Sequence, residues 1–133
     1  MESSKKNPLL TFALFAYNQE KYIEEAVLGA FSQTYSPLEI ILSDDCSPDN
    51  TFAIMEKMAK EYKGPHKIIL NKNQKNLGLI GHVNKIFTEF VNGEVIVVGA
   101  GDDISLPKRV QKTVESFNKN KDAISVSINF INI

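Results

Sequence analysis

The chain of 133 residues has little cysteine, little histidine and almost no net charge. A single cysteine, Cys46, cannot form an intramolecular disulfide, and no Cys and His cluster is present that would hold zinc. A net charge of −1 provides no overall positive field for nucleic acid or an anionic membrane. No apolar run approaches the roughly 20 residues of a membrane span. We therefore expect no nucleic-acid partner and no membrane contact within this chain, and the lone cysteine fits a reducing, cytoplasmic location.

The composition, 43% hydrophobic and 23% charged, is typical of one globular domain. Strands are predicted at residues 9–15, 38–42, 67–70, 95–98 and 123–130, and helical stripes at residues 23–30, 52–62, 79–90 and 110–117. Asn18 is predicted to cap the first helix, and Ser47 the second, with Pro48 at its first position. This alternation predicts an α/β fold, a Rossmann-like α/β/α sandwich around a mostly parallel sheet.

Two acidic pairs follow predicted strands, namely Asp44-Asp45 and Asp102-Asp103. Loops at the carboxyl ends of parallel strands emerge on one edge of the sheet, so both pairs are expected to line one crevice. Carboxylates there can bind Mg²⁺ or Mn²⁺ bridging a pyrophosphate, or accept hydrogen bonds from ribose hydroxyls or a base N–H. The alternative is that Asp44 and Asp45 only cap the next helix.

The loop after the first strand, Ala16-Tyr17-Asn18, contains no G-x-G-x-x-G pattern, which disfavours a dinucleotide held on glycines. His82 follows a predicted helix start and could approach a phosphate or an acceptor, although a solvated or locally bonded histidine is more common there. Lys72 and Lys75 could reach a diphosphate, yet a polar loop also carries lysines for solubility alone. Cys46 has no activating partner in the sequence.

Four segments together resemble family 2 glycosyltransferases of the GT-A fold, and they occur in the family's order across nearly the whole chain. They are Phe15-Ala-Tyr-Asn-Gln-Glu-Lys-Tyr-Ile-Glu-Glu-Ala26 with Phe31-Ser-Gln-Thr-Tyr35, then Ser43-Asp-Asp-Cys-Ser-Pro-Asp-Asn-Thr51, Asn76-Leu-Gly78, and Gly101-Asp-Asp103 followed by Pro107. The second segment is similar to the pattern Asp-Asp-x-Ser-x-Asp-x-Thr, and the fourth to the D-x-D region. Phe15-Ala16 stands where the family often carries Pro-Thr, and Gly101 supplies no carboxylate to the metal motif.

The resemblance implies transfer of a sugar, with inversion, from a nucleotide-diphosphate sugar to a glycan or lipid-linked acceptor in surface polysaccharide synthesis. It implies Mg²⁺ or Mn²⁺ as cofactor, with Asp103 and then Asp102 as metal ligands. Tyr17 would flank the base, and Asp45 would accept from a base imide N–H, which favours a UDP- or dTDP-type donor. The donor-binding residues implied are Ala16, Tyr17, Glu20, Asp45, Gly78 and Asp102.

The family's catalytic base is an acidic residue on a later element, and nothing after Asp122 is acidic in this chain. We therefore expect residues 1–133 to form a donor-binding domain that is incomplete at its C-terminal end and inactive alone. The base and the acceptor-binding half would lie beyond Ile133. The full-length protein could associate with the inner face of a membrane.

Two alternatives belong to other classes of protein. A receiver-like signalling module also has alternating strands and helices and places paired carboxylates around Mg²⁺. It would need an acidic pair after the first strand, where this chain has Ala16-Tyr17-Asn18. A nucleotidyltransferase uses similar metal chemistry, but it normally brings a glycine-rich basic loop for a triphosphate at that place.

Overall fold

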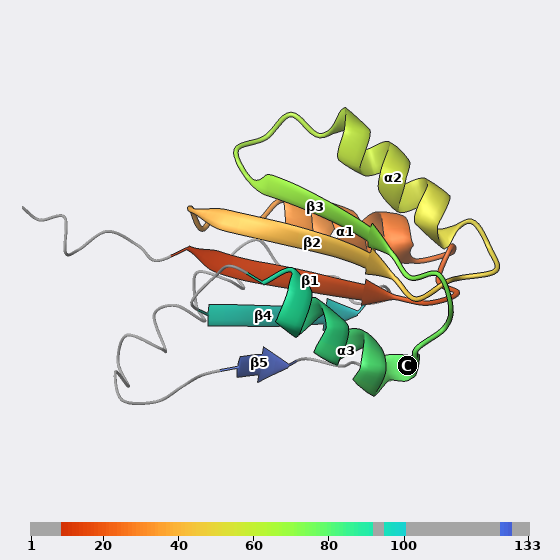
Figure 1. Ribbon diagram of the computed structural model, residues 1–133. Helices are drawn as coiled ribbons and strands as arrows, with labels where there is room; N and C mark the ends of the chain where they lie inside the picture. Colours follow the sequence, from red (N-terminus) through yellow and green to blue (C-terminus); the bar gives the residue numbers. More distant parts are fainter. Residues whose placement is uncertain (1–8, 92–94, 101–125, 129–133) are drawn as a thin grey trace, which may run out of the picture.

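The computed structural model describes residues 9–91, 95–100 and 126–128. Strands and helices alternate along the described residues from β1 to β4, as Figure 1 shows. The elements are β1 (Leu10–Ala16), α1 (Ile23–Phe31), β2 (Leu38–Asp44), α2 (Thr51–Glu61), β3 (Lys67–Lys72), α3 (Gly78–Glu89), β4 (Val95–Ala100) and β5 (Val126–Ile128). The helix predicted at residues 110–117 lies outside the described residues.

The strands form one sheet in the order β3-β2-β1-β4-β5, and every neighbouring pair is parallel. All seven residues of the central strand β1 are buried, which explains why six of them are apolar and only Thr11 is polar. The chain runs from β1 to β2 and β3 on one side and then crosses to β4 on the other. The carboxyl ends of β1 and β4 therefore flank the point where the winding direction reverses, the usual ligand position in such sheets.

Helices cover both faces of the sheet, so the predicted α/β/α sandwich with a parallel sheet is confirmed (Figure 1). On one face, α1 and α2 pack on Phe12 and Leu14 of β1 and on Ile40 and Leu42 of β2. On the other face, α3 packs through Ile86 on the opposite sides of the same strands. In the described part of the chain, no helix is long and apolar enough to cross a membrane.

Both predicted helix caps are wrong. Helix α1 begins at Ile23, and Asn18 lies in the preceding loop with a φ of 56°, so it does not cap the helix. Helix α2 begins at Thr51 with Asn50 as its cap residue, three positions later than predicted. Ser47 does not cap α2 because its hydroxyl donates to Asp44 and accepts from the Asn18 N–H. Asn18 and Ser47 instead join the loop after β1 to the loop after β2.

Strand β3 extends to Lys72, two residues beyond the predicted end. The extension occurs because Asn71 and Lys72 continue the parallel pairing with Ser43 and Asp44 of β2. The carboxyl ends of β2 and β3 consequently lie level with each other. This register brings the polar residues after β3 next to the acidic pair after β2.

Candidate functional site

The loops after β1, β2 and β3 are joined directly by backbone hydrogen bonds at the carboxyl edge of the sheet. The Asp45 N–H donates to the carbonyl of Ala16 over 2.9 Å, and the Asn73 N–H donates to the carbonyl of Asp44 over 2.8 Å. The structure thus brings together residues from three loops that are far apart in sequence. The candidate site is this edge.

Asp45 is the centre of the edge, and its side chain is only 3% exposed. Its carboxylate accepts hydrogen bonds from the backbone N–H of Leu77 at 2.8 Å, the backbone N–H of Gly78 at 3.0 Å and the side-chain amide of Asn73 at 2.9 Å. The first N–H groups of a helix need such an acceptor and carry its positive end. Asp45 therefore caps α3 from the neighbouring loop, and Oδ2, with one donor, keeps room for another.

Gly78 reaches Asp45 because its backbone adopts a φ of 77°, in the left-handed region that glycine enters without strain. Gly78 is also the first residue of α3. Ala16, Asp45 and Gly78, which were predicted separately as donor-binding residues, are thus connected by hydrogen bonds in one small region.

Asp44 is fully buried and has a local structural role. Its carboxylate accepts from the Ser47 N–H over 2.9 Å and from the Ser47 hydroxyl, closing the turn after β2. Neither aspartate caps the next helix, which was the alternative considered for both, because Asp44 bonds Ser47 ahead of α2 and Asp45 bonds the start of α3. The two neighbouring carboxylates have different tasks.

The loop between β1 and α1 is held by three side chains of the β2–α2 loop. Three successive backbone N–H groups each donate to one of these side chains, which alternate along the sequence. The pairs are Asn18 with Ser47 Oγ at 2.8 Å, Gln19 with Thr51 Oγ1 at 2.8 Å, and Glu20 with Asp49 Oδ2 at 3.2 Å. The segment Ser-x-Asp-x-Thr is therefore a docking surface for the first loop. Sequence reasoning missed this role, although three side chains with hydrogen-bonding oxygens recur at every second residue of this segment.

Asp49 remains charged at neutral pH. Desolvation raises the pKa of Asp49, but hydrogen bonds from the Thr51 hydroxyl and N–H and from the Glu20 N–H outweigh it, so the pKa lies below the ordinary 3.8. A charged carboxylate is the stronger acceptor for these donors.

Tyr17 and Glu20, two further predicted donor-binding residues, lie on the exposed side of this loop. Tyr17 is 46% exposed, which leaves a ring available to a ligand at the edge of the sheet. Glu20 is exposed as well, and its Oε1 accepts from the Asn50 N–H over 3.0 Å. The structure accordingly gives Glu20 a loop-bridging contact.

A buried polar network links His82 to Asp45, and sequence reasoning did not foresee it. Nε2 of His82 lies 2.6 Å from Ser43 Oγ, which also accepts from the side chain of Asn71. Asn71 in turn donates to Asn73, which donates to Asp45. His82 is 2% exposed, so it is not a solvated residue, and its polar partner lies 39 residues away in sequence.

Burial lowers the pKa of His82, the negative charges of Asp45 and Asp44 raise it, and Lys85 lowers it again. The sum lies below the ordinary 6.5, so His82 is neutral at pH 7. The neutral imidazole, bonded to the Ser43 hydroxyl, is therefore part of the hydrogen-bond network that positions Asp45.

The predicted metal ligands, Asp102 and Asp103, follow β4 and lie outside the described residues. Within the described ranges, no three His, Cys, Asp or Glu side chains gather as a metal site. Cys46 is a free thiol whose Sγ lies 3.6 Å from the carbonyl oxygen of Gln74.

The sequence of this chain is similar to the sequences of known proteins. The chain is 32% identical over 114 residues to EpsE of Bacillus subtilis (strain 168), described as a putative glycosyltransferase. The match covers 86% of this chain and 40% of EpsE. This chain therefore spans well under half of that relative.

Solved structures share the fold. TarS of S. aureus, residues 1–349 in complex with UDP-GlcNAc, superposes with a TM-score of 0.70 at 22% identity, covering 84% of this chain and 32% of that one. The mannosyltransferase PcManGT of Pyrobaculum calidifontis, in complex with GDP-Man and Mn²⁺, gives 0.66 at 23% identity, covering 74% and 28%. The predicted GT-A fold is confirmed.

The model of the family described as "Glycosyl transferase family 2" matches residues 11–133, which include every segment that carried the resemblance. This match selects the glycosyltransferase hypothesis over the receiver-like and nucleotidyltransferase alternatives. The chain belongs to glycosyl transferase family 2.

Proposed function

We propose that this chain binds the nucleotide-diphosphate sugar of a glycosyltransferase reaction, with a UDP- or dTDP-type donor held at the carboxyl edge of the sheet. The observation that carries the proposal is the combination of an exposed aromatic ring, Tyr17, with the carboxylate of Asp45 at that edge. An aromatic ring stacks on any base. A carboxylate oxygen with acceptor capacity left pairs with the imide N–H that uracil and thymine carry.

Asp102 and Asp103 are proposed to hold Mg²⁺ or Mn²⁺ against the donor diphosphate. They directly follow the Gly-Ala-Gly segment at the end of β4, the strand beside β1. A divalent metal neutralises the charge that develops on a leaving diphosphate. PcManGT, whose structure contains GDP-Man and Mn²⁺, supports the metal, and TarS, solved with UDP-GlcNAc, supports a uridine donor.

For the transfer step, we assign the base and the acceptor-binding half to residues beyond Ile133. No acidic residue follows Asp122 within the chain to activate an acceptor hydroxyl. The chain alone is then expected to bind the donor without transferring its sugar. The whole protein would transfer it with inversion to a glycan or lipid-linked acceptor in surface polysaccharide synthesis, at the cytoplasmic face of the membrane.

Calorimetric titration of the chain with UDP and Mn²⁺ tests the proposal, with Tyr17→Ala and Tyr22→Ala as a matched pair. Both tyrosines are exposed, 46% and 56%, so neither substitution disturbs the core. Loss of base stacking at Tyr17 is expected to weaken UDP binding about tenfold or more, whereas Tyr22→Ala leaves it unchanged. Asp103→Ala is expected to abolish the dependence of UDP binding on Mn²⁺.

Absence of UDP binding by the folded chain would contradict the proposal. Equal losses in the two tyrosine variants would also do so, because the effect would then not come from a stacked base. Circular dichroism of each variant establishes that the fold is retained.

A further inference from the structure

A cavity of about 670 Å³ opens at the carboxyl end of β3. Three lysines and three amide side chains line it together with one leucine, and no acidic residue is among them. The lining residues are Asn71, Lys72, Asn73, Gln74, Lys75, Leu77 and Lys85. We call this cavity the lysine pocket. In a chain with a net charge of −1, three positive charges in one cavity are a local concentration that predicts an anionic ligand.

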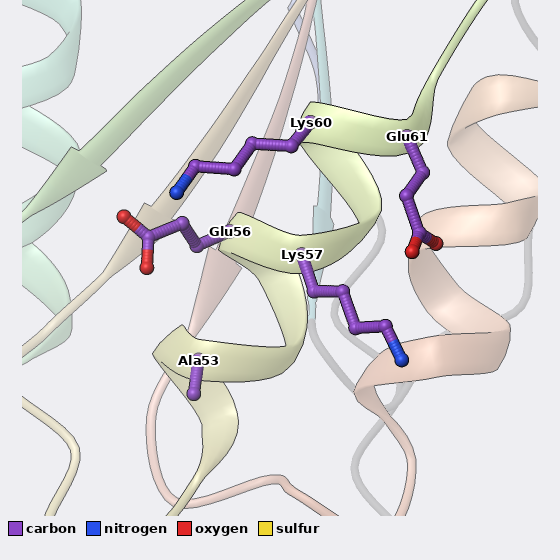
Figure 2. A pocket seen from close by; sticks show the side chains of 5 residues that line it. All are labelled: Ala53, Glu56, Lys57, Lys60 and Glu61. Carbon is purple, nitrogen blue, oxygen red and sulfur yellow. The ribbon is translucent and has the colours of Figure 1, made fainter.

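A second cavity, on α2, provides the comparison. Figure 2 shows its lining side chains, where Lys57 and Lys60 lie among Glu56 and Glu61. The charges of that cavity sum to zero, which is the ordinary pattern of a solvated helix surface. The lysine pocket lacks such balancing carboxylates.

The ammonium groups of Lys72 and Lys85 are positioned by neutral partners. Lys72 Nζ lies 5.2 Å from the centroid of the Phe52 ring, and Lys85 Nζ donates to Asn73 Oδ1 over 3.0 Å. Asn73 is 1% exposed, so it is a fixed anchor. These contacts orient the positive charges without neutralising them.

The nearest carboxylate in this network, Asp45, is linked to Lys85 through the side chain of Asn73, which donates to Asp45 and accepts from Lys85. It is 3% exposed and already accepts from Asn73, Leu77 and Gly78. The three lysines of the pocket therefore lie beside a carboxylate that is buried and hydrogen-bonded to neutral donors.

The lysine pocket is separate from the place proposed for the donor diphosphate. In the order β3-β2-β1-β4, three strand spacings divide the end of β3 from the end of β4, about 14 Å across the sheet. The position of the donor diphosphate is the only premise taken from the proposed function.

We propose that the lysine pocket binds a phosphate group other than the donor diphosphate, carried by a phosphorylated sugar. Lysines bind phosphate as point charges, whereas planar carboxylates are typically held by the paired N–H groups of arginine, which the described lining lacks. A sugar phosphate and free inorganic phosphate share this chemistry, so the test contains both.

The test is a titration of the 133-residue chain, without divalent metal and at fixed ionic strength, with glucose 6-phosphate, inorganic phosphate and glucose. Two double variants are compared, Lys72→Ala/Lys75→Ala in the pocket and Lys57→Ala/Lys60→Ala on α2. They change the net charge equally. The pocket variant is expected to lose about tenfold or more in affinity for both phosphate compounds, while the α2 variant retains the affinity of the unmodified chain.

Glucose 6-phosphate binding more tightly than inorganic phosphate supports a phosphorylated sugar as the ligand. Equal affinity supports the phosphate site and assigns it to the free ion. No binding of either compound, or equal losses in the two double variants, overturns the proposal. UDP binding with Mn²⁺ should persist in the pocket variant. A chain that binds glucose 6-phosphate but not UDP would refute the proposed donor site and leave the lysine pocket standing.

Discussion

At the scale of single residues, the site depends on a buried carboxylate that caps a helix from another loop. Asp45 satisfies the N–H groups of Leu77 and Gly78, and Gly78 can present its N–H only because its φ is 77°. The stability of this corner and the geometry offered to a ligand therefore depend on the same two residues.

Replacing Gly78 by alanine is expected to destabilise the chain through its backbone alone. A Cβ at Gly78 would meet no atom within 4 Å, so steric contact is absent. The left-handed conformation costs a residue with a Cβ about 1 kcal/mol or more. Urea unfolding of Gly78→Ala should show this loss. Leu79→Ala, an exposed change on the same turn, should show almost none, and equal effects would contradict the backbone explanation.

Replacing Asp45 by asparagine is expected to lower the free energy of unfolding by about 2 kcal/mol. The amide NH₂ of asparagine would face N–H donors that now meet carboxylate oxygens, so a buried donor would lack an acceptor. Denaturant unfolding measures the loss, with Glu56→Gln on α2 as a control. Unchanged stability in Asp45→Asn would show that the carboxylate does not hold α3.

At the scale of elements, the first two loops are joined by side chains of the second loop. Ser47, Asp49 and Thr51 accept from consecutive N–H groups of the loop that carries Tyr17. The position of the exposed ring thus depends on residues that do not themselves need to touch a ligand.

Thr51→Val is expected to loosen this loop. Valine has nearly the same shape but offers no acceptor to the Gln19 N–H, which should cost about 1 kcal/mol and accelerate hydrogen exchange at that amide. Thr51→Ser retains the hydroxyl and is expected to restore the protection of the Gln19 amide. Fast exchange in both variants would indicate that packing of the threonine methyl group holds the loop.

The strands and the helical stripes could be predicted from the sequence because burial imposes their periodicity. The helix caps could not, since Ser47 and Asn18 have the chemistry of caps but are bonded to each other across two loops. Such a choice between a local and a distant partner depends on the parallel register of β1 and β2. The contact between His82 and Ser43 could not be predicted either, because the two residues lie 39 positions apart in the sequence.

At the scale of the whole molecule, the predicted parallel sandwich and its family were found, and the loops after β1, β2 and β3 gather at one edge, whereas residues 101–107 of the fourth motif lie outside the described residues. The sequence motif Asp44-Asp45 does not by itself show that Asp44 closes a turn while Asp45 caps α3. Their separate hydrogen-bond partners become distinguishable only when β3 and α3 are in place.

Stability is expected to fall as the pH drops below about 6.5, because the pKa of His82 in the folded chain is lowered from that value. Between the lowered pKa of His82 in the folded chain and its pKa of about 6.5 in the unfolded chain, His82 binds a proton only in the unfolded chain. Acid therefore favours unfolding. The contribution is fully present above pH 6.5 and is lost progressively down to the folded pKa. The free energy of unfolding, measured with urea at several pH values in this range, should depend less steeply on pH in His82→Gln than in the unmodified chain. An identical dependence on pH would exclude His82 as the cause.

The carboxyl edge around Asp45 is proposed to be a nucleotide site. The most direct measurement is a nitrogen-15 NMR titration of the 133-residue chain with UDP and Mg²⁺, recording the backbone amides. If UDP binds at this edge, the amide signals of Tyr17, Asp45 and Gly78 shift together and saturably, while those of Lys57 and Lys60 on α2 do not change. Shifts confined to other surfaces, or none at all, would contradict the proposal.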